Sequence, residues 1–351
     1  MLIARAPMRI SFGGGGTDLE AYYAKYGGVV VSTAINKYFY AILTTEEADD
    51  VQVISADYRS LFRHASDTDL FWDGELALPK AVLHHFGVRR GVNLFLASEV
   101  PPGTGLGSSS AAAVTMVRAL STLLEQPLAK QQVAELASFI EITKMGMPIG
   151  KQDQYAAAFG GLNKITFTGA GVTVEPIAIA PDVLQTLERR LLLFFTGSSR
   201  ESTSILKQQR QATQDSDASV LQALHNIKRI ALDVQLCLER GDLDEFARLL
   251  HYSWQEKRRL APNLSNTFID ECYELARARG ASAGKITGAG GGGFMLLYCP
   301  EHAQESVTSA LEQRGLKGMN FHFDQQGATV LLNVATFNPA WIVPYTNEQE
   351  K

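Results

Sequence analysis

One loop constrains what this chain can fold into more than any other feature. Pro101 to Ser110 (PPGTGLGSSS) lies between a predicted strand, Val92 to Ala97, and a predicted helix, Ser109 to Leu124. Glycines at alternate positions let backbone N–H groups come close to an anion, and a helix that begins there adds the positive end of its dipole. The loop therefore predicts a polyphosphate site. Its predicted binding residues are Pro102, Gly103, Thr104, Gly105, Leu106, Gly107, Ser108, Ser109 and Ser110.

Two common nucleotide-binding patterns do not fit this loop. No Lys follows its last glycine, so it is not a Walker A loop, and GTGLG lacks the glycine spacing of the dinucleotide-binding fingerprint. The three serines can cap the following helix, and their hydroxyls can also reach a phosphate oxygen or Mg²⁺. Taken alone, the loop also fits an ordinary glycine turn before a helix.

Two further glycine runs lie near the two ends of the chain. In the first, Phe12 to Asp18 (FGGGGTD), four successive glycines are costly to order, which indicates close approach to a ligand. Asp18 can accept hydrogen bonds from a pair of substrate hydroxyls, and Arg9 can stabilise charge at a reacting oxygen. The alternatives are an N-cap for a helix at Leu19 to Tyr26 and a surface ion pair. The third run, Gly288 to Gly293, precedes an apolar strand, and three such loops together favour a binding cleft.

Composition limits the classes of function. The 351 residues, 46% hydrophobic and 20% charged, are enough for two packed domains. A formal net charge of -5 argues against nucleic-acid and anionic-membrane partners, so any phosphate must be held by local groups. The three cysteines lack CxxC spacing, and no segment has the roughly 20 apolar residues of a membrane span. Without a signal-peptide pattern near Met1, we expect a cytoplasmic protein.

The periodicity of the sequence predicts two domains. Residues 1–190 alternate β-rich runs, such as Gly28 to Thr45, with helical ones, which favours a mixed α/β domain. Residues 191–351 open with amphipathic helical stretches, Ser202 to Arg240 and Leu243 to Arg259. The rest is a predicted α+β sandwich, with a strand at Phe294 to Cys299, a helix at Glu301 to Arg314, and strands at Met319 to Phe323 and Thr329 to Leu332.

The three glycine loops, APMRISFGGGGTD, PPGTGLGSSSAAA and KITGAGGGGF, resemble motifs 1, 2 and 3 of the GHMP kinases in sequence, order and spacing. The resemblance covers roughly residues 3 to 335. It implies a two-domain α+β fold, with an N-terminal α/β domain of the ribosomal protein S5 domain 2 type at 1–190 and a ferredoxin-like α+β domain with added helices at 191–351. It also implies a kinase whose second loop binds ATP.

The resemblance also implies roles for four residues. The family's Asp that takes or orients the acceptor's hydroxyl proton matches Asp153 in GKQDQY, and Arg9 matches the basic residue placed beside it. Mg²⁺ is expected because a loop without Lys cannot neutralise the β- and γ-phosphates, and its implied ligands are Glu141 and Ser109. The structural alternatives are Asp153 as a cap of a helix at Gln154 to Phe159, and Glu141 as solvated surface.

Three segments narrow the resemblance. FGGGGTDL, GKQDQYAAAFGGLN and TGSSRESTSIL resemble the D-glycero-D-manno-heptose 7-phosphate kinases, which act at the anomeric O1. Fucokinases and glucuronokinases share a similar first motif, and mevalonate- or homoserine-type acceptors are the alternatives outside the sugars. The glycines of motif 1 replace the Gly-Glu-His-Thr-Asp pattern of galactokinases. The implied substrate-binding residues are Gly14, Gly15, Gly16, Thr17, Asp18, Lys151, Arg200, Gly290 and Gly291.

A phosphorylated acceptor needs cations apart from the ATP site. Arg200, Lys207 and Arg210 can share one face of a helix, although a solvated charged face is the alternative for the last two. For the adenine ring, the sequence offers only the region Tyr58 to Trp72 as a candidate wall. The expected partners are ATP and a sugar phosphate, and the expected state is a monomer or homodimer.

Overall fold

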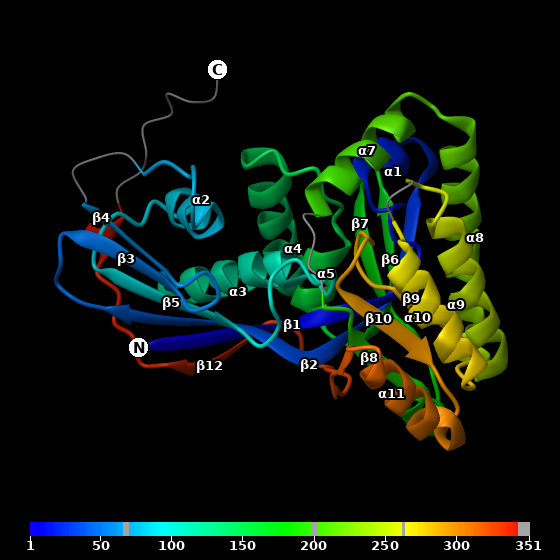
Figure 1. Ribbon diagram of the computed structural model, residues 1–351. Coiled ribbons are helices and arrows are strands. Elements are labelled where there is room, and N and C mark those ends of the chain that lie inside the picture. The colour runs from blue at the N-terminus through cyan, green and yellow to red at the C-terminus, as the bar shows by residue number, and fades with distance from the viewer. Residues whose placement is uncertain (66–69, 198–201, 262–263, 343–351) are drawn as a thin grey trace.

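A computed structural model describes residues 1–65, 70–197, 202–261 and 264–342. The polypeptide forms two sheets, one of eight strands and one of four, with helices packed on both (Figure 1). This arrangement confirms the predicted two-domain α+β architecture.

The larger sheet is built around one long strand. Its order is β12-β1-β2-β5-β3-β4, with β6 and β7 attached through β2. Residues 39–45 of β2 pair with β5, whereas residues 28–33 pair with β6, so the two ends of one strand have different neighbours. The strands are β1 (Leu2–Gly13), β2 (Gly28–Thr45), β3 (Asp50–Ser55), β4 (Ser60–Ala65), β5 (Val92–Ser98), β6 (Leu162–Thr168), β7 (Gly171–Pro176) and β12 (Thr329–Asn333).

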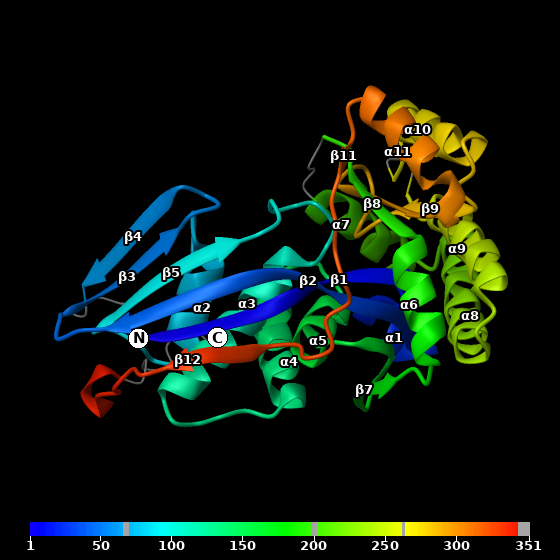
Figure 2. The same cartoon turned by 90° about the horizontal axis from the view of Figure 1, so that it is seen from below.

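Helices cover one face of this sheet (Figure 2). The central one, α3, is buried along most of its length, because small residues such as Ala111 and Ala113 allow it to pack closely on β1 and β2. This packing fixes the start of α3 beside the second glycine loop. The helices of this half are α1 (Glu20–Tyr26), α2 (Ala77–His85), α3 (Ser108–Leu123), α4 (Lys130–Ser138), a π-helical turn η1 (Phe139–Lys144), α5 (Gln152–Phe159) and α6 (Pro181–Arg190).

The smaller sheet has the order β11-β8-β10-β9, and every pairing in it is antiparallel. Its strands are β8 (Leu191–Phe195), β9 (Ala283–Ile286), β10 (Phe294–Tyr298) and β11 (Lys317–Gly318). The long helices α8 and α9 stand beside both sheets (Figure 1). The helices of this half are α7 (Ser202–Gln214), α8 (Ala218–Arg240), α9 (Leu243–Lys257), α10 (Thr267–Ala278), α11 (Gln304–Gln313) and the short 3₁₀ turns η2 (Glu301–Ala303) and η3 (Pro339–Trp341).

The end of the chain returns to the first sheet, which differs from the prediction. No strand forms at 319–323 beyond a bridge between Ile35 and Phe323, and β12 pairs with β1 rather than completing the smaller sheet. Asp324 turns the chain here, since its carboxylate accepts hydrogen bonds from the Tyr38 hydroxyl (2.9 Å) and the Gly327 N–H (2.8 Å). Figure 2 shows the returning segment running from β11 to β12.

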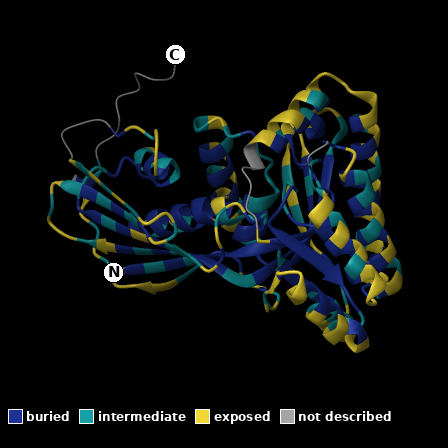
Figure 3. Ribbon diagram, in the orientation of Figure 1, coloured by how far each residue is buried: buried dark blue, intermediate teal, exposed yellow. Residues whose placement is uncertain are grey.

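A second difference lies in the helical half. The predicted stretch Ser202 to Arg240 is two helices, because Asp217 accepts hydrogen bonds from the backbone N–H groups of Ser219 and Val220 and so starts α8. Buried residues line the facing sides of sheets and helices (Figure 3). In the described part of the chain, no helix combines the length and the apolar character that a membrane crossing requires.

Candidate active site

A cleft of about 160 Å³ opens where the three glycine loops meet. Its walls come from the first loop (Phe12 to Asp18), the second loop (Pro101 to Ser110) and the third loop (Gly288 to Gly293). The segment 147–153 and the helices α7 and α9 complete the lining. The predicted convergence of the three loops is therefore confirmed.

Direct contacts hold the loops together. The backbone N–H of Arg9 donates to the Leu106 carbonyl (3.0 Å), and that of Phe294 donates to the Thr104 carbonyl (3.1 Å). The second and third loops touch at Gly105 and Gly288, where a β-carbon on Gly288 would lie 2.4 Å from the Gly105 Cα. Both glycines also have positive φ, so a side chain at either position would separate the loops.

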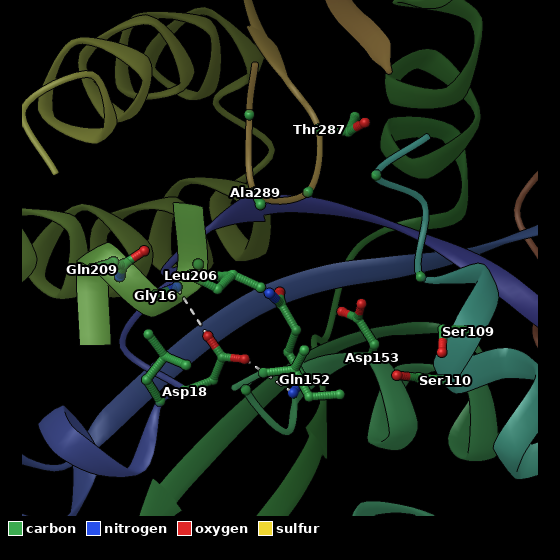
Figure 4. A pocket seen from close by; sticks show the side chains of 18 of the residues that line it. Gly16, Asp18, Ser109, Ser110, Gln152, Asp153, Leu206, Gln209, Thr287 and Ala289 are labelled. Atoms are coloured by element: carbon green, nitrogen blue, oxygen red, sulfur yellow. Dashed lines mark hydrogen bonds between the residues drawn. The ribbon is translucent and has the colours of Figure 1, made fainter. Parts of the chain in front are cut away.

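An ion pair stands at the centre of the cleft. Arg9 donates from Nε to Oδ1 of Asp153 (2.7 Å) and from Nη2 to Oδ2 (2.8 Å), and its Nη1 donates to the Gly105 carbonyl (2.6 Å). Arg9 is only 3% exposed, whereas the Asp153 side chain keeps 22% of its surface open to the cleft. Asp153 lies in the first turn of α5 but makes no cap hydrogen bond. Figure 4 shows its carboxylate between Asp18 and Ser109.

Asp18 is held at one end of the cleft. Its Oδ1 accepts from the Gly16 N–H (2.9 Å) and its Oδ2 from the Gln152 N–H (3.2 Å), as Figure 4 shows. It does not cap α1, whose N-cap is Leu19. Oδ2 fills the space of a β-carbon at Gly150, which would lie only 1.9 Å away. Burial, and then the nearby Asp153 charge, raise the pKa of Asp18.

Glu141 lies behind the other end of the cleft, on the π-helical turn η1. Its Oε1 accepts from the Ser109 hydroxyl (2.9 Å) and its Oε2 from the Gln154 amide (2.6 Å). The residue is completely buried, which excludes the solvated-surface alternative. Burial raises the pKa of this carboxyl to about 7, against the lowering effect of hydrogen bonds from Gln154, Ser110 and Ser109.

The start of α3 faces the cleft without a side-chain cap. Its N-cap is Gly107, and Ser108, Ser109 and Ser110 make no cap hydrogen bond, so the first N–H groups of the helix remain available. Of the predicted phosphate-loop residues, those that line the cleft are Gly103, Gly105, Gly107, Ser108, Ser109 and Ser110. Thr104 and Leu106 are fully buried and hold the loop through their carbonyls, as described above.

A second cavity, of about 380 Å³, adjoins the first. The two share Gly103, Ser108, Ser109 and Met147, and Pro102 lines the second one only. Its walls are largely apolar, with Phe39, Leu96, Val100, Ala112, Met116 and Met145 among them. Of the two ends of the predicted wall region, Tyr58 lines this cavity and Trp72 does not.

Several predicted substrate residues lie elsewhere. Gly14 and Thr17 do not line the cleft, and the Thr17 hydroxyl donates to the carbonyls of Gly14 (2.8 Å) and Val29 (3.0 Å). Lys151 points to the ring of Tyr23, with its Nζ 5.2 Å from the centroid. Gly15, Gly16, Asp18 and Gly290 line the cleft, and Gly291 does not.

The predicted acceptor-phosphate cations are not seen in the cleft. Lys207 and Arg210 are exposed on α7 and are absent from the lining, while Leu206 and Gln209 face inward. Arg200 lies outside the described residues. α7 therefore turns its apolar and amide side chains toward the cleft and its described cations away from it.

Sequence reasoning missed two buried lysines beside the cleft. Lys257 at the end of α9 and Lys285 in β9 are 8% and 3% exposed. Lys257 belongs to the charged run WQEKRR, which has the composition of a solvated helix end, and no local signal marks it. Lys285 precedes the third glycine loop directly, and that position was the available signal.

Comparisons with known proteins agree with this geometry. The family GHMP kinases N terminal domain matches residues 76–161, and GHMP kinases C terminal matches residues 234–317. The D-glycero-alpha-D-manno-heptose 7-phosphate kinase of Campylobacter jejuni is 32% identical over 329 residues, which are 92% of this chain and 96% of that protein.

Two solved structures have the same fold. A D-glycero-D-manno-heptose 1-phosphate kinase from Bacteroides thetaiotaomicron has a TM-score of 0.78 at 28% identity, with 95% of this chain and 100% of that chain covered. A putative sugar kinase from Campylobacter jejuni has a TM-score of 0.76 at 31% identity, with 94% and 97% covered. The two domain matches, the full-length relative and the three converging loops lead to one conclusion: the chain belongs to the GHMP kinase family and is a sugar kinase.

Proposed function

We propose that this kinase transfers the γ-phosphoryl group of ATP to the anomeric O1 of D-glycero-D-manno-heptose 7-phosphate, giving the 1,7-bisphosphate. The observation that carries the proposal is the Arg9–Asp153 pair, whose Asp153 carboxylate lies between the start of α3 and Asp18 (Figure 4). The heptose phosphate acceptor is favoured by the full-length similarity to the Campylobacter jejuni enzyme of that name. A fucose- or glucuronate-type anomeric kinase is the alternative.

Asp153 receives the proton of the acceptor hydroxyl. As the O1–P bond forms and the bond between the β,γ-bridging oxygen and the γ-phosphorus breaks, ADP leaves and the O1 proton passes to the carboxylate. Arg9 orients that carboxylate, because its planar guanidinium holds both oxygens. The first N–H groups of α3 stabilise the charge on the transferred group.

The residues at the start of α3 also fit Mg²⁺. The Ser109 hydroxyl and the Glu141 carboxylate are hard oxygen donors 2.9 Å apart, and the buried carboxylate has no cation beside it among the described residues. Both residues would hold the ion there. Bound Mg²⁺ would neutralise charge on the β- and γ-phosphates.

The second cavity is the proposed adenine site. It shares the second glycine loop and the start of α3 with the cleft, so a nucleotide whose phosphates lie on the loop can place its base there. Its apolar walls suit a flat ring, and the methionines at 116, 145 and 147 can adapt to it.

A panel of acceptors in a coupled ADP-release assay tests the proposal. The panel contains heptose 7-phosphate, the unphosphorylated heptose, fucose, glucuronate and mevalonate. We expect the highest kcat/KM with heptose 7-phosphate. Faster ADP formation with any other acceptor would replace the proposed substrate with that one.

A further inference from the structure

Gly15 has no conformational or steric reason to be a glycine. The neighbouring Gly14 and Gly16 have φ of 88° and 98°, and a β-carbon on either would meet an atom at 1.9 Å or 2.4 Å. Gly15 has no positive φ, and its nearest neighbours would be Nε2 of Gln152 at 3.8 Å and Oγ of Ser11 at 3.9 Å. The folded chain would accept alanine at this position.

No other glycine in the wall of the cleft shares this property. The glycines at 16, 103, 105, 107, 288, 290 and 292 all have positive φ, and a β-carbon at 150 would collide with Asp18. Gly15 also lines the cleft and directly precedes Gly16, which Figure 4 shows beside Gln209 at the end opposite Ser109 and Ser110. The missing side chain therefore leaves space at the acceptor end of the cleft.

The space beside Gly15 is bordered by two buried lysines. Lys257 lines the cleft, and behind it a cavity of about 10 Å³ is lined by Ser11, Gly15, Gln152, Lys257 and Lys285. Lys257 donates to the carbonyls of Ile286 (3.2 Å) and Gly288, which leaves one of its three N–H bonds. Among the described residues, Lys285 donates only to the Phe12 carbonyl (3.4 Å). Neither ammonium forms an ion pair within the described part of the chain.

The charges around this space are mostly positive. Arg9 is paired with Asp153, and Asp18 is the one further carboxylate that acts on Lys257. Burial lowers the pKa of Lys257 well below its usual range and the pKa of Lys285 to about 7. The nearby cations lower both pKa values further, because they repel a buried ammonium. An anion beside them would supply the missing opposite charge.

Three buried polar atoms nearby also lack partners among the described residues: the Gln152 side-chain oxygen, which is an acceptor, and two donors. The Ser11 hydroxyl and the Gln209 amide nitrogen form no hydrogen bond among the described residues, and their side chains are 5% and 4% exposed. Gln209 lines the cleft and Ser11 lines the small cavity behind it. Unpaired buried donors are costly, so both groups indicate a polar ligand at this end.

We propose that the space over Gly15, bordered by Lys257, receives the phosphate that the sugar acceptor carries away from its reacting hydroxyl, and that Gly15 selects for this acceptor. The inference rests on the proposed function, and it moves the acceptor-phosphate site from the α7 cations to α9. A methyl group at position 15 takes the place of the phosphate or of the carbon that bears it. Lys257 provides the charge, and Lys285 supports it from behind.

The test compares heptose 7-phosphate with the unphosphorylated heptose in Gly15→Ala, Lys257→Met and the wild type. We expect both variants to lower kcat/KM for the phosphorylated sugar by about tenfold or more, while the rate with the unphosphorylated sugar and the KM for ATP change little. Gly169→Ala, in the exposed β6–β7 turn with no atom within 4 Å, and the exposed Lys317→Met are the matched controls. Gly15→Ala leaves the hydrogen bonds of Lys257 intact. This variant therefore tests the phosphate subsite even if Lys257→Met folds poorly.

The other outcomes separate the two proposals. Equal losses with both sugars would overturn the subsite and assign Gly15 and Lys257 to the sugar ring or the fold. If only Lys207→Met and Arg210→Met lowered kcat/KM for the phosphorylated sugar, the phosphate would bind at α7. That result would also overturn the proposed subsite. A wild-type enzyme that prefers an unphosphorylated sugar would remove the proposed function itself, and the subsite with it.

Discussion

Both carboxylate oxygens of Asp153 are held by one guanidinium, that of Arg9, at 2.7 and 2.8 Å. The two residues are 144 positions apart, and the pair joins β1 to the first turn of α5. The same guanidinium also holds the Gly105 carbonyl of the second glycine loop. The proposed proton acceptor and the proposed phosphate loop are thus positioned by one side chain.

Replacing Asp153, the proposed proton acceptor, is expected to separate catalysis from binding. In Asp153→Asn, kcat falls by about 10²- to 10⁴-fold because the amide cannot take the hydroxyl proton, while the KM for ATP stays close to that of the wild type. Steady-state kinetics with a thermal-unfolding control measures this. The exposed Asp182→Asn on α6 is the matched control. A kcat near the wild-type value in a folded Asp153→Asn protein would refute the assignment.

The length and shape of the Arg9 side chain matter as well as its charge. Arg9→Lys keeps the charge but loses the second hydrogen bond to Asp153 and the bond to Gly105. We expect kcat to fall by about tenfold or more, because a lysine ammonium cannot hold both carboxylate oxygens of Asp153 and the Gly105 carbonyl in the same planar arrangement. Steady-state kinetics of the two folded proteins checks this, and equal kcat values would contradict it.

Glu141 makes stability depend on pH. Burial raises its pKa from 4.5 to about 7, so the folded protein keeps this proton where the unfolded chain has released it. The free energy of unfolding therefore falls as the pH rises from about 4.5 to about 7, by on the order of 3 kcal/mol. Denaturant unfolding without metal should show a flatter decline in Glu141→Gln, and no change in the exposed Glu312→Gln. If the free energy of unfolding fell with pH equally in Glu141→Gln and the wild type, Glu141 would not be the cause of the pH dependence.

Asp18 depends on the absence of a side chain at position 150. In Gly150→Ala the new methyl group would lie within 1.9 Å of the Asp18 carboxylate, which must move and lose its hydrogen bond from Gln152. Since small misplacements are costly, kcat/KM for the acceptor should fall by about 10²-fold. Isothermal titration should find ATP affinity unchanged. Weakened ATP binding with normal acceptor kinetics would place Asp18 in the wrong subsite.

The proposed adenine cavity can be filled from α3. Ala112 is 6% exposed and lines it, so Ala112→Leu adds bulk where the base would lie. The KM for ATP should rise by about tenfold with little change in the acceptor KM. If the two KM values rose together, the cavity would not be specific to the base.

The sequence was most informative where backbone geometry dictates residue type. The glycine runs were visible because positive φ and close loop contacts, as at Gly105 and Gly288, leave few alternatives to glycine. The strand Gly28–Thr45 was predicted with its observed bounds, because β-branched and aromatic residues recur along its whole length.

What the sequence did not reveal depends on long-range packing. Lys257 and Gln209 face the cleft because of how α7 and α9 pack, and each lies in a polar run that equally fits solvent. The pairing of β12 with β1 joins residues more than 300 positions apart, and the local pattern of Thr329 to Leu332 does not indicate its partner. The sequence shows four similar glycines in this loop. Only the structure distinguishes Gly15, which could carry a side chain, from Gly14 and Gly16, which could not.

The position of phosphorylation tests the central claim most directly. Wild-type enzyme, ATP, Mg²⁺ and heptose 7-phosphate are incubated, and the product is followed by ³¹P NMR with proton coupling. We expect a second phosphate resonance coupled to the anomeric proton, formed together with ADP and lost in Asp153→Asn. A new phosphate coupled to any other sugar proton, or ADP formed without a phosphorylated sugar, would contradict it.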